Sequence, residues 1–132
     1  MNDPLTIVQT AYAAFGRGDV PAMLGMMSDS FALKFHGDRA APYTASIVGK
    51  GQMAEWFGAV AQADHFEVFE PREFFAGPEH VTVLGWERTV TQPGGGSFEC
   101  EWVHVWTVKA GLITRLWGML DSEAAGRARA SR

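Results

Sequence analysis

The first part of the chain has the apolar spacing of helices. Its apolar positions lie three or four residues apart, at Leu5, Val8, Tyr12 and Phe15. This spacing predicts an amphipathic helix from Asp3 to Gly16, with Asn2 or Asp3 as its cap. A second, short helix is expected after Asp19, and a third from about Gln52 to Ala63 with its apolar residues on one side.

The later part of the chain alternates between apolar and polar residues, as strands do. Strands are expected at 31–35, 66–75 and 81–92, and on either side of a turn in the block 98–121. Pro71 interrupts one of them, which favours a position at the edge of a sheet or a bulge. Residues 122–132 are polar and alanine-rich, and we expect a short tail there, with a last helical turn and a frayed end.

Helices that precede a run of strands predict an α+β fold with a curved, mostly antiparallel sheet. When the N-terminal helices lie across the open side of a strongly bent sheet, the result is a cone that encloses an apolar pocket. At 132 residues the chain is long enough to bury such a core, and we expect a single domain over 1–132.

Composition and charge argue against some classes of partner. The net charge is -4 and no run of Lys or Arg forms a basic stripe, so nucleic acid and anionic membranes are poor candidates. No apolar run is long enough to cross a bilayer, and the N-terminus lacks the basic and apolar segments of a secretory signal. The single cysteine, Cys100, cannot form an internal disulfide. We therefore expect a cytoplasmic protein.

The block 98–121 holds the candidate site, because Ala110-Gly111 is a turn signal that closes a β-hairpin. With a two-residue loop, Lys109 lies opposite Leu112, and the remaining pairs follow by counting along both strands. One face of the hairpin then carries Cys100, Trp102, His104, Trp106, Arg115, Trp117, Met119 and Asp121. Large aromatic side chains around a histidine, an arginine and a carboxylate are typical of a ligand-binding wall.

A second register prediction concerns the preceding strand, 81–92. The expected facing pairs are Gln92 with Ser97, Arg88 with Glu101, and Glu87 with Trp102. Glu87 then joins the face of Trp102, and an ion pair between Arg88 and Glu101 supports the same register from the other face. A slip of one residue would turn Glu87 outward instead.

Several phrases of the chain resemble the SnoaL-like group of the nuclear transport factor 2 superfamily. They are AYAAFGRGDVPAM, FEPREFFAG, VTVLGWERT and EWVHVWTVKAGLITRLWGMLD, and they cover nearly the whole chain. The family includes polyketide cyclases, ketosteroid isomerase, scytalone dehydratase and limonene epoxide hydrolase. The resemblance implies a cone-shaped α+β fold with an apolar pocket, often assembled as a homodimer through the sheet. It does not imply one reaction, because this fold carries many chemistries.

Comparison with the residue patterns of individual family members favours some of the family's reactions over others. The epoxide hydrolase pattern has an arginine two residues before the Glu87 position, where this chain has Gly85. It also has a tyrosine and an asparagine in the first strand, where this chain has Leu33, Lys34 and Phe35. Epoxide hydrolysis is therefore disfavoured. A cyclase-like reaction asks mainly for an acid/base carboxylate, a polar partner and an apolar cavity.

Three residues are the catalytic candidates. Asp121 ends an apolar strand, where burial would raise its pKa towards a useful range, and the matching acid in the family commonly does acid/base work. The alternative is that Asp121 caps the tail helix. His104 could shuttle a proton or bind a ligand carbonyl, or it could be a histidine satisfied by its neighbours. Glu87 is a partner acid if it points inward, and a surface charge if the register slips.

Other residues are candidates for contact with a ligand. They are Trp102, Trp106, Trp117, Met119 and Tyr43. The tryptophans would form the wall of the pocket, and Tyr43 would donate a hydrogen bond from a loop over its mouth. No metal is expected, because the spacing of the three catalytic candidates matches no short metal-binding motif.

Two functions from different classes remain. The favoured one is a cofactor-free enzyme of isomerase or cyclase type, which transfers a proton next to the carbonyl of a hydrophobic ring compound. Asp121 would be its acid or base, with His104 as partner or oxyanion donor and Glu87 as auxiliary acid. The other is a non-catalytic module that binds an apolar small molecule, which His104 and Asp121 merely orient.

Overall fold

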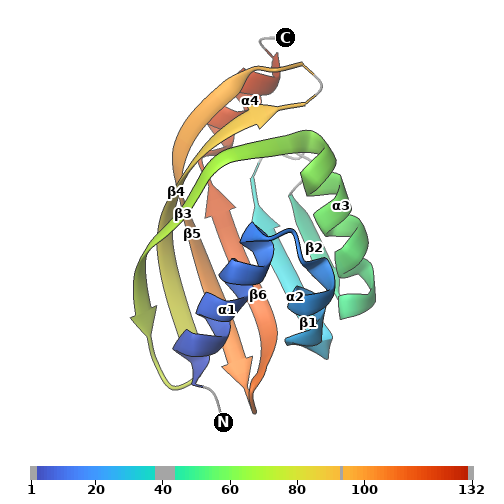
Figure 1. The fold of residues 1–132 in the computed structure, drawn as a ribbon, viewed down its shortest axis with the longest axis vertical. Helices are drawn as coiled ribbons and strands as arrows, with labels where there is room; N and C mark the ends of the chain where they lie inside the picture. The colour runs from blue at the N-terminus through green and yellow to red at the C-terminus, as the bar shows by residue number, and fades with distance from the viewer. Residues whose placement is uncertain (1–2, 38–43, 93, 131–132) are drawn as a thin grey trace.

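The computed structural model describes residues 3–37, 44–92 and 94–130. Its elements follow one another as α1 (Pro4–Gly16), α2 (Val20–Gly25), β1 (Met27–His36), β2 (Ala45–Val48), a 3₁₀ turn (Lys50–Gln52), α3 (Met53–Ala63), β3 (Asp64–Ala76), β4 (His80–Thr91), β5 (Ser97–Lys109), β6 (Leu112–Leu120) and α4 (Ser122–Ala130). Helix α1 begins and helix α4 ends at opposite ends of the molecule (Figure 1).

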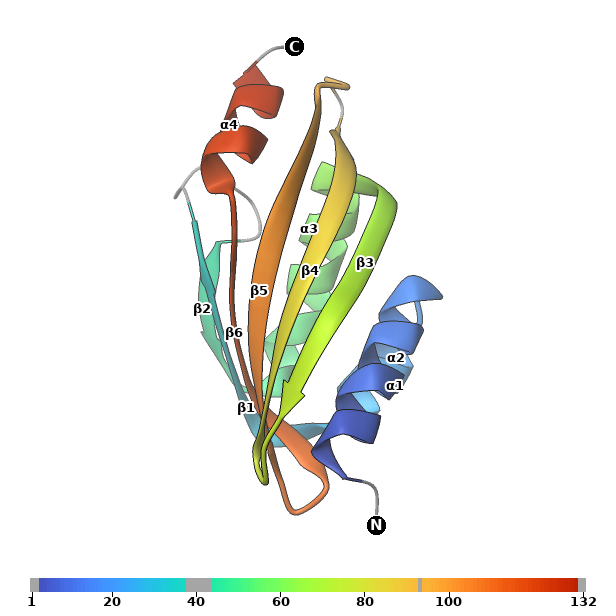
Figure 2. The ribbon, with the colours of Figure 1, turned by 90° about the vertical axis from the view of Figure 1, so that its left-hand side faces the viewer.

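The strands form one sheet in the order β2-β1-β6-β5-β4-β3. Neighbouring strands are antiparallel except β1 and β6, which run parallel. The sheet is curved and does not close, so β2 and β3 remain its edges (Figure 2). Helices α1, α2 and α3 lie against one face, and α4 lies at one end of the sheet beside β5 (Figure 1). The predicted α+β class and the curved, mostly antiparallel sheet are confirmed.

The first two helices start at the caps that the sequence predicts. Asp3 accepts a hydrogen bond from the N–H of Thr6 at 2.8 Å, and Asp19 accepts one from the N–H of Ala22 at 3.1 Å. A carboxylate at this position satisfies a backbone donor that has no partner inside the helix. Among the described helices, none combines the length and the apolarity that a membrane span requires.

Two elements differ from the prediction. Strand β2 lies in a segment expected to be a loop, and α4 is a helix of 9 residues where a single turn was expected. Helix α4 is stabilised because Ala125 and Ala128 are buried in a cluster with Phe98 and Cys100. This contact joins segments of the chain that show no common local pattern. The frayed end expected after α4 lies outside the described residues.

Pro71 lies on an edge strand at a bulge, as predicted. Strand β3 pairs only with β4, and the register of that pair shifts between Pro71 and Glu73. An edge strand tolerates proline because one side of its backbone needs no ladder partner.

The hairpin of β5 and β6 starts in the predicted register and then departs from it. The first facing pairs are as predicted, Lys109 with Leu112 and Val108 with Ile113. Thr107 then pairs with Arg115, which leaves Thr114 as an extra residue in a β-bulge. Because side chains alternate with a period of two, one extra residue exchanges the two faces for the rest of the strand.

The bulge corrects two candidate ligand contacts. Trp117 pairs with Val105 and Met119 pairs with Val103, on the face that points away from α1, α2 and α3. The prediction that Trp117 and Met119 line the pocket is therefore wrong. The inner face of β6 instead carries Leu116, Gly118 and Leu120.

Strands β4 and β5 also pair differently from the prediction, but no residue changes face. Val90 lies opposite Ser97, where Gln92 was expected, and Glu87 lies opposite Cys100. The register is shifted by two residues, so the alternation of side chains keeps Glu87 on the inner face. The predicted inward direction of Glu87 is confirmed.

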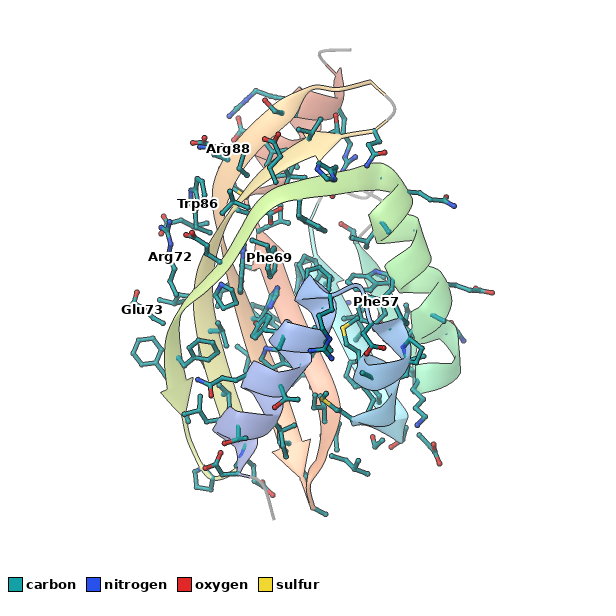
Figure 3. The ribbon with its side chains drawn as sticks, viewed as in Figure 1. Phe57, Phe69, Arg72, Glu73, Trp86 and Arg88 are labelled. Carbon is teal, nitrogen blue, oxygen red and sulfur yellow. The ribbon has the colours of Figure 1, made fainter. Side chains whose placement is uncertain are left out.

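Charged residues occupy the outer face of the same strands. Arg88 forms its ion pair with Glu99, at 3.0 Å, where Glu101 was the predicted partner. Trp86 lies beside this pair, with the Arg72 guanidinium 5.0 Å and the Arg88 guanidinium 5.7 Å from its ring centroid. Figure 3 shows Arg72, Trp86 and Arg88 projecting away from the helices. The homodimer expected through the sheet stays a prediction.

Gly85 leaves room for a large side chain of the inner face. A Cβ at this position would lie 2.1 Å from Cζ2 of Trp102. The indole therefore packs directly on the backbone of β4. The arginine of the epoxide hydrolase pattern would need this same space.

We expect Gly85→Ala to lower the free energy of unfolding by about 1–3 kcal/mol, the usual cost of overpacking a core. The added methyl group must displace the ring of Trp102. Urea denaturation followed by tryptophan fluorescence measures the change. Gly58→Ala is the control, since no atom lies within 4 Å of a Cβ at this exposed position in α3. An unchanged midpoint for Gly85→Ala would contradict the packing of Trp102 on this glycine.

Candidate functional site

A cavity of about 80 Å³ lies between the inner face of the sheet and helices α1, α2 and α3. Besides tryptophans, the polar side chains of its largely apolar wall are Tyr12, Asp64, Glu87 and His104. It adjoins a cleft of about 660 Å³, with which it shares wall residues such as Phe57 and Phe69. Figure 3 shows these two phenylalanines on the sides of α3 and β3 that face the space between helices and sheet. A few polar groups in an apolar cavity are the usual arrangement of a small-molecule site.

His104 belongs to a hydrogen-bond chain that crosses from the sheet to helix α1. The Nε1–H of Trp106 donates to Oη of Tyr12 at 2.9 Å, and this Oη lies 2.7 Å from Nδ1 of His104. The imidazole is buried, with 8% of the residue exposed. Burial lowers the pKa of His104 to about 3 and raises the pKa of Tyr12 well above its usual range. Both side chains are therefore uncharged at neutral pH.

Aromatic rings fix the orientation of the imidazole. Trp102 stacks on His104 with 4.2 Å between ring centroids, and Phe69 stacks on Trp102 at 4.8 Å. On β6, a Cβ at Gly118 would lie 3.0 Å from Cδ2 of His104 and 2.7 Å from the ring of Phe35. The bare backbone of Gly118 therefore allows both rings to approach the sheet closely.

Glu87 supplies a carboxyl group to the cavity wall, where only 2% of the residue is exposed. The hydroxyl of Thr89 donates a hydrogen bond to Oε2 of Glu87. Burial raises the pKa of Glu87 to about 7; the Thr89 hydrogen bond opposes this shift, and the charge of Asp64 adds to it. Asp64 is itself buried and forms an ion pair of 2.7 Å with Arg129 of α4. Helix α4 thus contributes a positive charge beside Asp64, the carboxyl group whose own charge acts on Glu87.

Glu87 and His104 occupy different ends of the cavity wall. Glu87 lies opposite Cys100, which precedes His104 by four residues (100 to 104) on β5. At about 3.3 Å per residue, the two backbone positions are roughly 13 Å apart. Trp102 lies between them on the same face. The wall therefore has two polar ends separated by an aromatic surface.

The structure brings together four of the predicted site residues. The cavity is lined by Glu87, Trp102, His104 and Trp106. Trp117 and Met119 lie on the outer face of the sheet, as described above. Tyr43 lies outside the described residues.

Asp121 is absent from this group. Strand β6 ends at Leu120, and the side chain of Asp121 is exposed. Its Oδ1 accepts a hydrogen bond of 3.1 Å from the N–H of Ala124, in the first turn of α4. The prediction that Asp121 shares the pocket wall with His104 is wrong, because the β6 bulge and the end of the strand remove it from that face. Asp121 instead caps helix α4, which was the alternative role considered for this residue.

Two residues of the site are absent from the sequence-based candidates. Tyr12 belongs to the apolar stripe of α1, and its hydroxyl is the signal that could have marked it, because a buried hydroxyl needs a partner. Asp64 follows α3 directly and binds Arg129, 65 residues later. No local pattern indicates an ion pair over that separation.

The buried thiol of Cys100 is unsuited to act as a nucleophile. Burial raises its pKa to about 12, and the neighbouring carboxyl group of Glu87 acts in the same direction. Within the described ranges, no three His, Cys, Asp or Glu side chains are grouped as metal ligands would be.

Substitutions of Asp121 test its role as a cap. We expect Asp121→Ala to lower the free energy of unfolding by about 1 kcal/mol, because the N–H of Ala124 loses its acceptor. Asp121→Asn should stay within a few tenths of a kcal/mol of wild type, since asparagine caps helices as well as aspartate does. Thermal denaturation of both variants measures the difference. Equal losses of stability in the two variants would contradict the cap.

Glu87 should make the stability depend on pH. Its pKa is about 7 in the folded protein, against an ordinary value of 4.5. Between these values the folded protein binds more protons than the unfolded chain, so the free energy of unfolding falls as the pH rises. Glu87→Gln removes this dependence and should gain on the order of 3 kcal/mol relative to wild type between about pH 4.5 and pH 8.

Urea denaturation at a series of pH values measures this gain. Glu99→Gln is the matched control, because Glu99 is an exposed residue of β5 in a surface ion pair. Parallel pH curves for wild type and Glu87→Gln would show that the carboxyl group titrates alike in the folded and unfolded protein.

Known proteins share both the sequence pattern and the fold of this chain. The sequence matches the SnoaL-like domain family over residues 8–116. An NTF2-like protein from Burkholderia xenovorans LB400 is 27% identical, with a TM-score of 0.85 over 94% of this chain and 93% of its own. An NTF2-like protein from Burkholderia thailandensis E264 is 23% identical, with a TM-score of 0.88 over 98% of each chain. TerC, crystallised with polyporic acid, is 21% identical, with a TM-score of 0.80 over 94% of this chain and 95% of its own.

No curated protein matches the sequence significantly. The family match nevertheless spans most of the chain, and the structural matches extend over almost all of it. The resemblance inferred from the sequence is confirmed. The chain belongs to the SnoaL-like domain family.

Proposed function

We propose that the protein is an enzyme that performs cofactor-free acid/base chemistry, of the isomerase or cyclase type, on an apolar ring compound with a carbonyl group. The observation that carries this proposal is the carboxyl group of Glu87, which is buried in an apolar cavity wall and has a pKa of about 7. At neutral pH such a group is partly ionised, so it can take up a proton and return it.

The reaction uses a base at one end of the cavity and a hydrogen-bond donor at the other. The Glu87 carboxylate removes a proton from a C–H that is conjugated with the substrate carbonyl, and becomes a carboxylic acid. The electron pair of that bond moves to the carbonyl oxygen, where an N–H of the neutral His104 stabilises the enolate. Return of the proton to a different carbon yields an isomer. Attack of the enolate carbon on a second carbonyl of the same molecule closes a ring, and the alkoxide formed from that carbonyl takes the proton back from the Glu87 carboxylic acid.

The size of the substrate follows from the distance between the two ends. Roughly 13 Å separate the backbone positions of Cys100, opposite Glu87, and His104. A conjugated ring system can connect a C–H at one end to a carbonyl at the other. The cavity alone, at about 80 Å³, is smaller than such a molecule, which would extend into the adjoining cleft. TerC, which shares the fold, was crystallised with polyporic acid.

The base is tested by exchange of the acidic C–H hydrogens of 2-tetralone in D₂O, followed by ¹H NMR; these hydrogens lie next to the carbonyl, so the probe reports on Glu87 and does not span the wall to His104. We expect wild type to accelerate this exchange, and Glu87→Gln to lose at least about a hundredfold of the acceleration, as the removal of a general base does. Glu99→Gln, the same substitution at an exposed position, should exchange at the wild-type rate. Full activity of a folded Glu87→Gln protein would remove Glu87 from the mechanism.

The pH profile of the same reaction identifies the base. Because the carboxylate is the active form, the rate should rise through about pH 7, the pKa of Glu87, and then level off. Thr89→Val removes a hydrogen bond that lowers this pKa, so the rise should move to higher pH. The charged or titratable groups around Glu87 are Asp64 of β3 with its partner Arg129 of α4, and Cys100 of β5. Asp64→Asn should move the rise in the opposite direction.

Binding without chemistry is the second candidate function. The observation that favours it is the neutral, fully packed His104, which would orient a ligand equally well in a binding protein. In that case 2-tetralone would bind to the cavity, and its exchange would proceed at the rate of the buffer alone.

A further inference from the structure

We infer that Trp106 and Tyr12 hold His104 in the neutral tautomer that carries its proton on Nε2, so that this end of the cavity selects a ligand with a hydrogen-bond acceptor and no donor. The inference deepens the proposed function, on which it rests only for the claim that the ligand is a carbonyl compound. The tautomer follows from the hydrogen-bond chain itself.

Trp106 determines the direction of the chain. The indole Nε1 is a donor and has no lone pair to accept with, so Oη of Tyr12 accepts at this contact of 2.9 Å. The phenol keeps one proton to donate. The partner available to it in the chain is Nδ1 of His104, at 2.7 Å.

The opposite arrangement would leave a proton without a partner. If Nδ1 of His104 carried the hydrogen, Tyr12 would accept from both neighbours, and its own O–H would have no acceptor among the described residues. A buried hydroxyl proton without an acceptor is unfavourable. Tyr12 therefore donates to Nδ1, and the single proton of the neutral imidazole lies on Nε2.

The remaining donors of this wall are unused within the described part of the chain. No hydrogen bond joins Nε2 of His104 to a described residue. The Nε1 of Trp102, which is 4% exposed and stacks on the imidazole at 4.2 Å, is buried and also lacks a partner among those residues. The Nε1 of Trp102 has almost no accessible surface, whereas the imidazole of His104 lines the cavity, so an oxygen with free lone pairs is the ligand group that satisfies Nε2–H.

This arrangement discriminates between ligands of the same shape. A ketone oxygen accepts from Nε2–H and brings no hydrogen of its own. The corresponding alcohol can accept as well, but its hydroxyl proton then lies against an apolar wall whose side-chain nitrogens at this end are donors. We expect the cavity to bind 1-indanone about tenfold more tightly than 1-indanol.

The tautomer is measured directly by ¹⁵N NMR of protein labelled at its 4 histidines, with the His104 signals assigned by their loss in His104→Gln. The pattern of couplings between ring nitrogens and ring hydrogens identifies which nitrogen carries the proton. We expect pure Nε2–H in wild type from pH 5 to pH 9. The Nδ1–H form, or a mixture, in wild type would overturn the inference.

Two variants test whether Trp106 and Tyr12 cause this preference. Trp106→Phe removes the donor to Tyr12, and Tyr12→Phe removes the donor to His104, so both should populate the Nδ1–H form and reduce the preference for the ketone severalfold. Trp86→Phe, the same kind of change on the outer face, should alter neither. An unchanged tautomer in both folded variants would show that the chain does not set it, and would overturn the inference.

The outcomes separate the inference from the proposed function. Pure Nε2–H with preferred ketone binding, but without exchange of 2-tetralone, would support the inference and contradict the enzyme. Exchange that depends on Glu87 in a protein with the Nδ1–H form would support the enzyme and contradict the inference.

Discussion

The hydrogen bond between Tyr12 and His104 joins the helical layer to the centre of the sheet. Trp106 donates to the same hydroxyl, and the remaining contacts that the described residues make between α1 and the sheet are apolar, through residues such as Val8 and Ala11. Apolar contacts are not directional, so they hold two layers together without fixing one position along the surface. A hydrogen bond of 2.7 Å to a fully packed ring does fix it. The position of α1, and with it one wall of the cavity, depends on this contact.

The opposite end of the cavity depends on charge. Glu87 and Asp64 are both buried, and two carboxylates in a medium of low dielectric cannot both be ionised without a compensating charge. Arg129 provides that charge from the last turn of α4. The C-terminal helix is therefore tied electrostatically to the site, although its alanines account for its packing. The strong burial of Glu87 leaves its carboxyl group close to half-ionised at neutral pH.

The two ends of the cavity wall differ in charge, and this difference determines how a ligand can be oriented between them. At one end the polar groups are locked by hydrogen bonds and carry no charge near neutral pH. At the other end a carboxyl group changes its charge near pH 7. The stacked rings of Phe69 and Trp102 lie along the wall between them, and Gly85 gives the indole its place on the sheet. A flat, apolar ligand with one acceptor oxygen matches this arrangement, because its ring would lie on the aromatic wall and its oxygen would face the neutral donor end.

Much of the fold was predictable because the signals were local. The caps at Asp3 and Asp19, the apolar stripe of α1 and the bulge at Pro71 each follow from neighbouring residues. The inward direction of Glu87 was also predictable despite a wrong register. A shift of two residues preserves the face of every side chain, and the alternation along β4 was clear.

The sequence by itself therefore determined most of the elements, the class of fold and which face of β4 and β5 is apolar, because periodicity is a property of adjacent residues; strand β2 and the full length of α4 were not among them. Tertiary structure alone decided the rest. The bulge at Thr114 turned Trp117 and Met119 outward and left Asp121 to cap α4, and a bulge depends on how two strands pair rather than on either strand alone. The partners that define the site are equally remote, since Tyr12 binds His104 across 92 positions. Contacts of this kind are made by packing the helices on the sheet, and no spacing within the chain encodes them.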